Sequence, residues 1–66
     1  MNLRRMELNN LRWRWVGKWV EAFSIANPDI SATGIILQVE YDQRNDRFQY
    51  LLSDQLGFFH NPTLVA

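Results

Sequence analysis

Residues 33–54, T-G-I-I-L-Q-V-E-Y-D-Q-R-N-D-R-F-Q-Y-L-L-S-D, decide the fold of this chain. Apolar side chains recur at every second position of the first half: Ile35, Leu37, Val39 and Tyr41. The residues between them become polar from Gln38 onward, so strand periodicity predicts one wholly apolar face and one that turns polar. We expect a strand whose apolar face is half buried against a core.

The second half of this stretch indicates a chain reversal. Residues 42–47 are all polar, and their Asn and Asp side chains favour turns because they tolerate left-handed backbone and bond neighbouring main-chain groups. Phe48, Tyr50 and Leu52 then resume the alternation. The whole stretch therefore predicts a β-hairpin.

Length and composition place the chain in the class of small single domains. It has 66 residues, no cysteine, and three Trp, four Phe and two Tyr. No disulfide can support so small a core, so stability must come from packing of these aromatic side chains or from a partner subunit. No apolar run approaches the roughly 18 residues of a membrane span. We expect a soluble, cytoplasmic protein.

Charge is unevenly distributed although the formal net charge is zero. Residues 1–18 carry five cationic side chains against one carboxylate, and residues 19–66 carry two against six. Such asymmetry is typical of a basic arm that meets an anionic partner, or of two halves that attract each other within the fold or between two copies.

The N-terminal part admits two interpretations. Residues 1–10 are mostly polar and predict a flexible arm or one or two turns of helix. Residues 11–16, L-R-W-R-W-V, alternate strictly and favour a strand. The four-residue spacing of Leu11, Trp15 and Trp19 fits a helix instead, but Gly17 is unfavourable in a helix interior. We expect a strand here.

The remaining segments predict further short strands. Residues 18–25 form a strand with apolar side chains on both faces, and Pro28 ends it. After the hairpin, Gly57 permits a turn into a short fourth strand over residues 58–60. Residues 61–63 predict another turn, followed by a three-residue stub.

From Val16 onward this succession resembles an SH3-like or Tudor-like small barrel. The resemblance rests on the opening strand 16–22, the irregular loop to Ile30, Gly34-Ile35-Ile36 at the start of the hairpin, and Asn61-Pro62 before Leu64-Val65. It implies a mainly-β fold: a partly open barrel of four to six short antiparallel strands over residues 11–66, with a flexible or short helical arm over residues 1–10. The segment 11–16 or a second copy would then cover the open edge.

No pattern predicts catalysis, a cofactor or a metal site. His60 is the sole histidine, so Ser53, Asp54 and His60 are not read as a nucleophilic site, and we expect His60 to be a hydrogen-bonding residue at a strand end. The carboxylates near the hairpin tip lack the glycine and the closing glutamate of a calcium loop. We therefore expect no enzyme activity, no cofactor and no small-molecule substrate.

One segment suggests a binding surface, in which cationic and aromatic side chains alternate. Its residues are Arg12, Trp13, Arg14, Trp15, Lys18 and Trp19. These tryptophans could simply be core, with the arginines in water. If exposed, they suit a protein partner, because Trp is a frequent interface anchor, or single-stranded nucleic acid, because bases stack on aromatic rings beside cations. We expect a non-enzymatic adaptor or regulatory module that binds another protein or a second copy; a nucleic-acid-binding regulator and a self-assembling structural protein are the alternatives.

Overall fold

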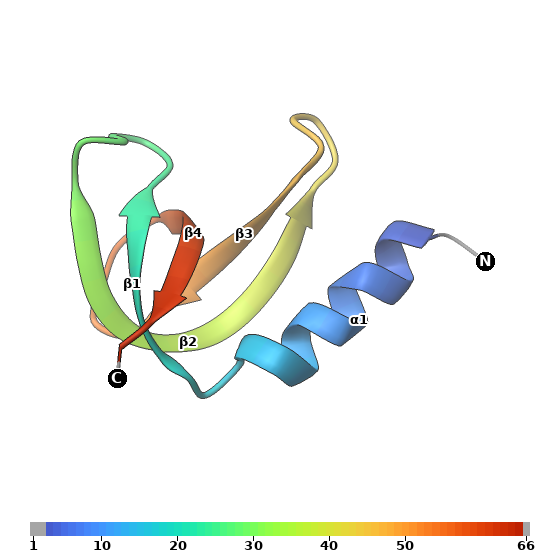
Figure 1. The fold of residues 1–66 in the computed structure, drawn as a ribbon. Coiled ribbons are helices and arrows are strands. Elements are labelled where there is room, and N and C mark those ends of the chain that lie inside the picture. The colour runs from blue at the N-terminus through green and yellow to red at the C-terminus, as the bar shows by residue number, and fades with distance from the viewer. Residues whose placement is uncertain (1–2, 66) are drawn as a thin grey trace.

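The computed structural model describes residues 3–65, which form one helix and four strands. The elements are α1 (Leu3–Trp15), β1 (Trp19–Ser24), β2 (Ser31–Asp42), β3 (Arg47–Leu52) and β4 (Phe58–Leu64). The strands form a closed antiparallel barrel in sequence order, and β4 pairs with both β3 and β1 (Figure 1). The mainly-β class and the small barrel are confirmed. The barrel has four strands and is closed, where a partly open one was expected.

The predicted hairpin is present as β2 and β3. Asp42 pairs with Arg47, and residues 43–46 form the turn. The Asp42 carboxylate accepts hydrogen bonds from the Asn45 side-chain amide at 2.8 Å and from the Arg44 main-chain N–H at 3.1 Å. These bonds from one main-chain group and one side chain of the turn explain why a polar Asx-rich sequence reverses the chain here.

A β-bulge in β2 changes which side chains reach the core. Ile36 pairs with Leu52 and Gln38 pairs with Leu51, so Leu37 is an extra residue without a partner on β3. Ile36 and Val39 are buried, whereas Leu37 is exposed. The expectation that Ile35 and Leu37 share a buried face with Val39 is therefore wrong. A bulge also bends its strand, and β2 is the strongly curved strand of Figure 1.

β1 confirms the expected strand over residues 18–25. Val20 and Ala22 face the core, and Trp19, Glu21 and Phe23 face outward. All three outward side chains are exposed, so β1 carries apolar residues on both faces.

β4 is longer than expected and closes the barrel. It continues through Asn61 and Pro62, where a turn was predicted, and Asn61 has a left-handed φ of 53°. The β1–β4 register shifts between Glu21 and Phe23, so the chain accommodates an irregularity at this point instead of reversing. The turn predicted over residues 61–63 is wrong, and Leu64 of the predicted stub belongs to β4, while Ala66 lies outside the described residues. β1 needs neither the N-terminal segment nor a second copy to cover this edge.

The strand expected over residues 11–16 is wrong, because these residues belong to helix α1 as far as Trp15. Gly17, which is unfavourable in a helix interior, lies beyond the helix end with φ 89°. A glycine in this left-handed conformation commonly ends a helix. The energetic cost of a glycine in a helix interior therefore does not apply to Gly17. The predicted boundary between an arm and a barrel at residue 10 lies inside α1.

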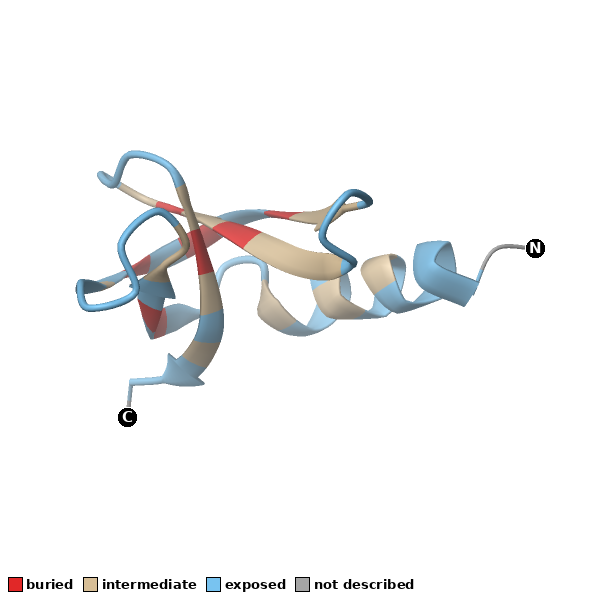
Figure 2. Ribbon diagram, turned by 90° about the horizontal axis from the view of Figure 1, so that it is seen from above, coloured by how far each residue is buried: buried red, intermediate tan, exposed pale blue. Residues whose placement is uncertain are grey.

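The core is small and lies inside the barrel. Its buried side chains come from all four strands: Val20, Ala22, Ile36, Val39, Tyr50, Leu52 and Phe59. Leu8, Leu11 and Trp15 of α1 are partly buried against this core, at the three- and four-residue spacing of one helix face. Figure 2 shows the buried positions on the strands and exposed positions on the helix. In the described part of the chain, α1 is too short and too polar to cross a membrane.

Candidate binding groove between the helix and the barrel

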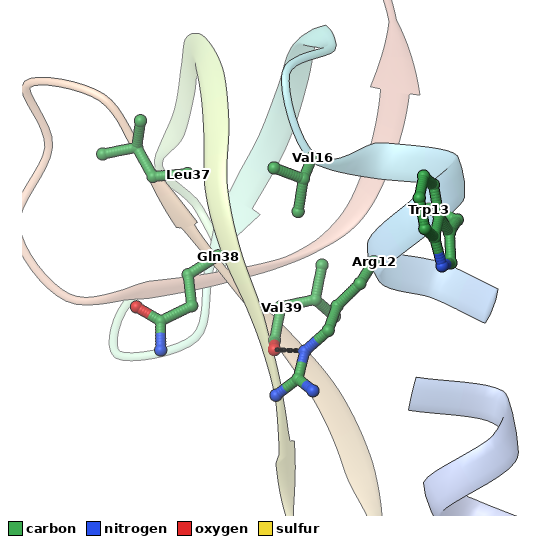
Figure 3. Close-up of a pocket in the computed structure, with 6 residues that line it drawn as sticks. All are labelled: Arg12, Trp13, Val16, Leu37, Gln38 and Val39. Carbon is green, nitrogen blue, oxygen red and sulfur yellow. Dashed lines mark hydrogen bonds between the residues drawn. The ribbon is translucent and has the colours of Figure 1, made fainter. Parts of the chain in front are cut away.

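A groove of about 410 Å³ lies between the end of α1 and the bulged part of β2. We call it the α1–β2 groove. Residues Arg12, Trp13, Val16, Leu37, Gln38 and Val39 line it. Figure 3 shows Arg12 and Trp13 on the helix, Val16 just beyond its end, and Leu37, Gln38 and Val39 on β2, with Arg12 reaching Val39.

Two features of the structure create this groove. The helix face formed by Leu8, Leu11 and Trp15 packs on the core, so Trp13 is directed away from the core by helical geometry. On the other wall, the bulge leaves both Leu37 and Gln38 exposed. Helix phase and bulge together place apolar side chains outside the barrel.

Three of the side chains that line the groove are both apolar and exposed. Trp13 is 90% exposed, Leu37 55% and Val16 45%. Single exposed apolar residues are normal, but a cluster beside a concave surface is typical of an interaction site.

Arg12 supplies the charge at the base of the groove. Its Nε donates a hydrogen bond to the Val39 carbonyl oxygen at 3.3 Å, across the groove (Figure 3). This bond joins the helix to β2 and orients the guanidinium group. On the rim, the Gln38 side-chain amide donates to the Glu40 carboxylate at 2.6 Å. The groove therefore has a cation on the helix side and an anion beside its strand side.

The predicted surface is divided by the helix. The Arg14 guanidinium carbon lies 5.5 Å from the centre of the Trp15 ring, and Trp15 meets Tyr50 edge-on with ring centres 6.3 Å apart. Burial raises the pKa of the Tyr50 hydroxyl above its ordinary value. Trp15 thus packs against the core, and of the six predicted residues only Arg12 and Trp13 line the groove.

Lys18 and Trp19 lie at the start of the barrel. The Lys18 carbonyl accepts a hydrogen bond from the Ile36 N–H at 3.0 Å, which extends the β1–β2 pairing. Trp19 is on the outer face of β1, opposite Ile35. Neither residue lines the groove.

The sequence-based surface missed four groove residues: Val16, Leu37, Gln38 and Val39. The helical template, in which Val16 follows Trp13 by three positions, would have indicated Val16. Leu37 depends on the bulge, for which the alternating sequence gives no sign.

The basic helix and the hairpin tip are in direct contact at the opposite end of α1. Arg4 Nε lies 3.3 Å from the Asp46 carboxylate, and Arg4 also pairs with Glu7 at 3.0 Å. The Tyr41 hydroxyl donates a hydrogen bond to Asp46, and this bond raises the pKa of Tyr41 above its ordinary value. The carboxylates raise the pKa of Arg4 as well, Asp46 more than Glu7. The two oppositely charged parts of the chain therefore attract each other within the fold.

Ser53, Asp54 and His60 lie at separate positions of the barrel. The Ser53 hydroxyl accepts a hydrogen bond from the Ile35 N–H at 2.9 Å. His60 lies in β4, paired with Phe23, and Asp54 lies in the turn after β3 with φ 60°. Among residues 3–65, no group of three or more His, Asp or Glu side chains is arranged to hold a metal ion.

Comparison with known proteins adds no relative. No family model, curated protein or solved structure matches this chain. The small closed barrel is consistent with the SH3-like resemblance at the level of architecture.

Proposed function

We propose that the chain is a non-enzymatic adaptor or regulatory module that binds another protein through the α1–β2 groove. The observation that carries this proposal is the position of Trp13, almost fully exposed beside a groove whose other walls include the exposed Val16 and Leu37. Trp and Arg are the residues most enriched among side chains that dominate the energy of protein interfaces. Here Trp13 and Arg12 are adjacent in the same groove.

The arrangement favours protein over nucleic acid as the partner. Successive helical residues differ by about 100° around the axis, so the alternating arginines and tryptophans of residues 12–15 do not form one surface. Trp15 packs against Tyr50, and Arg14 stacks on Trp15. Of the two tryptophans in residues 12–15, only Trp13 is open to a stacked base. We retain a nucleic-acid-binding regulator as the second candidate, and a cytoplasmic location as a prediction.

Site-specific photocrosslinking tests the proposal. A photoreactive phenylalanine analogue is placed at Trp13 or at Leu56, which is 97% exposed in the loop between β3 and β4. In cells that express the chain, we expect discrete protein adducts from position 13 and not from position 56. Mass spectrometry identifies the adducts.

Two results would contradict the proposal. The same adducts from both positions would show that the groove is not a specific site. Adducts to nucleic acid from position 13 would favour the second candidate, in which the Arg12→Ala/Arg14→Ala double variant should lower affinity similarly for unrelated sequences and reduce the salt dependence.

A further inference from the structure

We propose that the α1–β2 groove binds a second copy of this chain, in a two-fold dimer in which Trp13 of each copy enters the groove of the other. The inference rests on the proposed function and names the partner of that same groove. In a two-fold dimer both subunits use the same surface, which must therefore be complementary to itself. Shape and charge at this groove meet that condition.

The shape argument comes from Trp13 and the space beside it. Trp13 protrudes from the helix and also forms one wall of the groove, so a single surface carries both a projection and a hollow (Figure 3). A volume of about 410 Å³ lies within the roughly 300–1,000 Å³ of pockets that hold small ligands, so it is large enough for an indole ring. Two-fold symmetry would place each indole between Val16 and Leu37 of the other copy.

The charge argument comes from the opposite signs on the two walls. Arg12 lies on the helix wall, and Glu40 lies beside the strand wall, bonded there by Gln38. In a two-fold dimer that sets the helix wall of one copy against the strand wall of the other, Arg12 of each copy lies near Glu40 of the other. The formal net charge of zero means that two copies carry no overall repulsion.

The size of the groove sets the expected affinity. A standard interface buries about 800 Å² per partner with roughly 20–30 residues a side, and the groove has six lining residues. Even with neighbouring contacts, this is a small interface. We therefore expect a reversible dimer with a Kd on the order of 10 μM.

Sedimentation equilibrium on the full chain, from about 1 to 500 μM, tests the inference. We expect monomer at the lowest concentration and dimer at the highest. Trp13→Ala should raise the dimer Kd at least tenfold, and Leu56→Ala, at an equally exposed apolar position, should leave it unchanged. Circular dichroism confirms that both variants fold, and this separates a lost interface from a lost structure.

A charge exchange provides a second measurement that does not depend on Trp13. Glu40→Arg alone should weaken the dimer, because Arg12 would then face a like charge. The double variant Arg12→Glu/Glu40→Arg should restore much of the affinity. Additive weakening in the double variant would show that these two residues do not meet across the dimer.

The results separate this inference from the proposed function. A chain that stays monomeric at 500 μM, or a dimer unaffected by Trp13→Ala, would overturn the inference. Protein adducts at position 13 that contain other proteins and no second copy would overturn it too, while they would support the proposed function. Absence of any protein adduct at position 13 would count against both.

Discussion

Gly34 shows how one missing side chain supports the barrel. It is buried in β2 opposite Val20, and a Cβ at this position would lie 3.1 Å from the Ser53 carbonyl oxygen and 3.3 Å from Leu52 Cβ. Two of the nearest atoms belong to Ser53, whose hydroxyl also binds the Ile35 main chain. Strand β2 and the end of β3 therefore approach closely here, and a side chain at this position would require its neighbours to move.

We expect Gly34→Ala to lower the free energy of unfolding by about 1–3 kcal/mol, the usual cost of an extra methyl group in a well-packed core. Urea denaturation followed by tryptophan fluorescence measures the change. Thr33→Ala, at the exposed neighbouring position, serves as the control and should cost less than about 1 kcal/mol. Equal effects of the two substitutions would show that the close approach at Gly34 can relax.

Asp42 links the hairpin turn to pH. Hydrogen bonds from Asn45, above all from its side-chain amide, hold the pKa of the Asp42 carboxyl below its ordinary value. A lowered pKa means that Asp42 stabilises the fold at pH values above the unfolded-state pKa. This contribution is lost as pH falls through the lower pKa of the folded state.

We expect Asp42→Asn to lower the thermal midpoint at neutral pH and to make the midpoint less sensitive to pH between about 5 and 2. The comparison is Asp29→Asn, because the Asp29 carboxylate has no hydrogen bond to another described residue. Thermal unfolding at a series of pH values measures both slopes. An unchanged acid slope in Asp42→Asn would assign the acid sensitivity to another carboxyl group.

At the scale of elements, α1 is attached to the barrel by one face. Trp15 lies on that face with Leu8 and Leu11, and Trp13, two positions away, lies off it. Helix α1 has no fully buried residue, so tertiary packing on this face must supply much of its stability.

We expect Trp15→Ala to lower the free energy of unfolding by about 2 kcal/mol, less than the roughly 3–5 kcal/mol for a fully buried aromatic. Trp13→Ala should change it by less than about 0.5 kcal/mol, as is usual for surface positions. Chemical denaturation at about 1 μM, where we expect monomer, measures both. A large effect of Trp13→Ala at this concentration would mean that Trp13 also packs within its own chain.

The sequence predicts elements best where pattern and turn chemistry agree. The β2–β3 hairpin satisfies both conditions and was predicted. Residues 11–16 fit two periodicities at once, and the choice failed because Gly17 was placed inside a helix that ends before it. The bulge at Leu37 bends β2 into the barrel, and the alternating sequence gives no sign of it.

The residues of the candidate site also divide into those that the sequence predicts and those that it does not. Arg12 and Trp13 were predicted because their residue types are informative by themselves. Prediction of Val16 as a groove residue required the correct helix, and prediction of Leu37 required the bulge. The full groove therefore depends on two tertiary features that a sequence pattern does not contain.

At the scale of the whole molecule, the oppositely charged parts of the chain are in contact. The N-terminal part is basic and the remainder acidic, and Arg4 joins them by its ion pair with Asp46. An exposed ion pair of this kind contributes little to the free energy of unfolding by itself. The position of the ion pair is more important for holding α1 on the barrel. The ion pair lies at the far end of α1 from the groove, and Arg12 joins α1 to β2 at the groove itself.

The β1–β4 pairing sets the order in which the molecule can assemble. The β2–β3 hairpin joins residues separated by one short turn, whereas β1 and β4 lie near opposite ends of the described chain. Closing a long loop costs more entropy than closing a short one, and distant contacts slow folding. We therefore expect the hairpin to form early and closure of the barrel by β4 to be the late step that limits the folding rate.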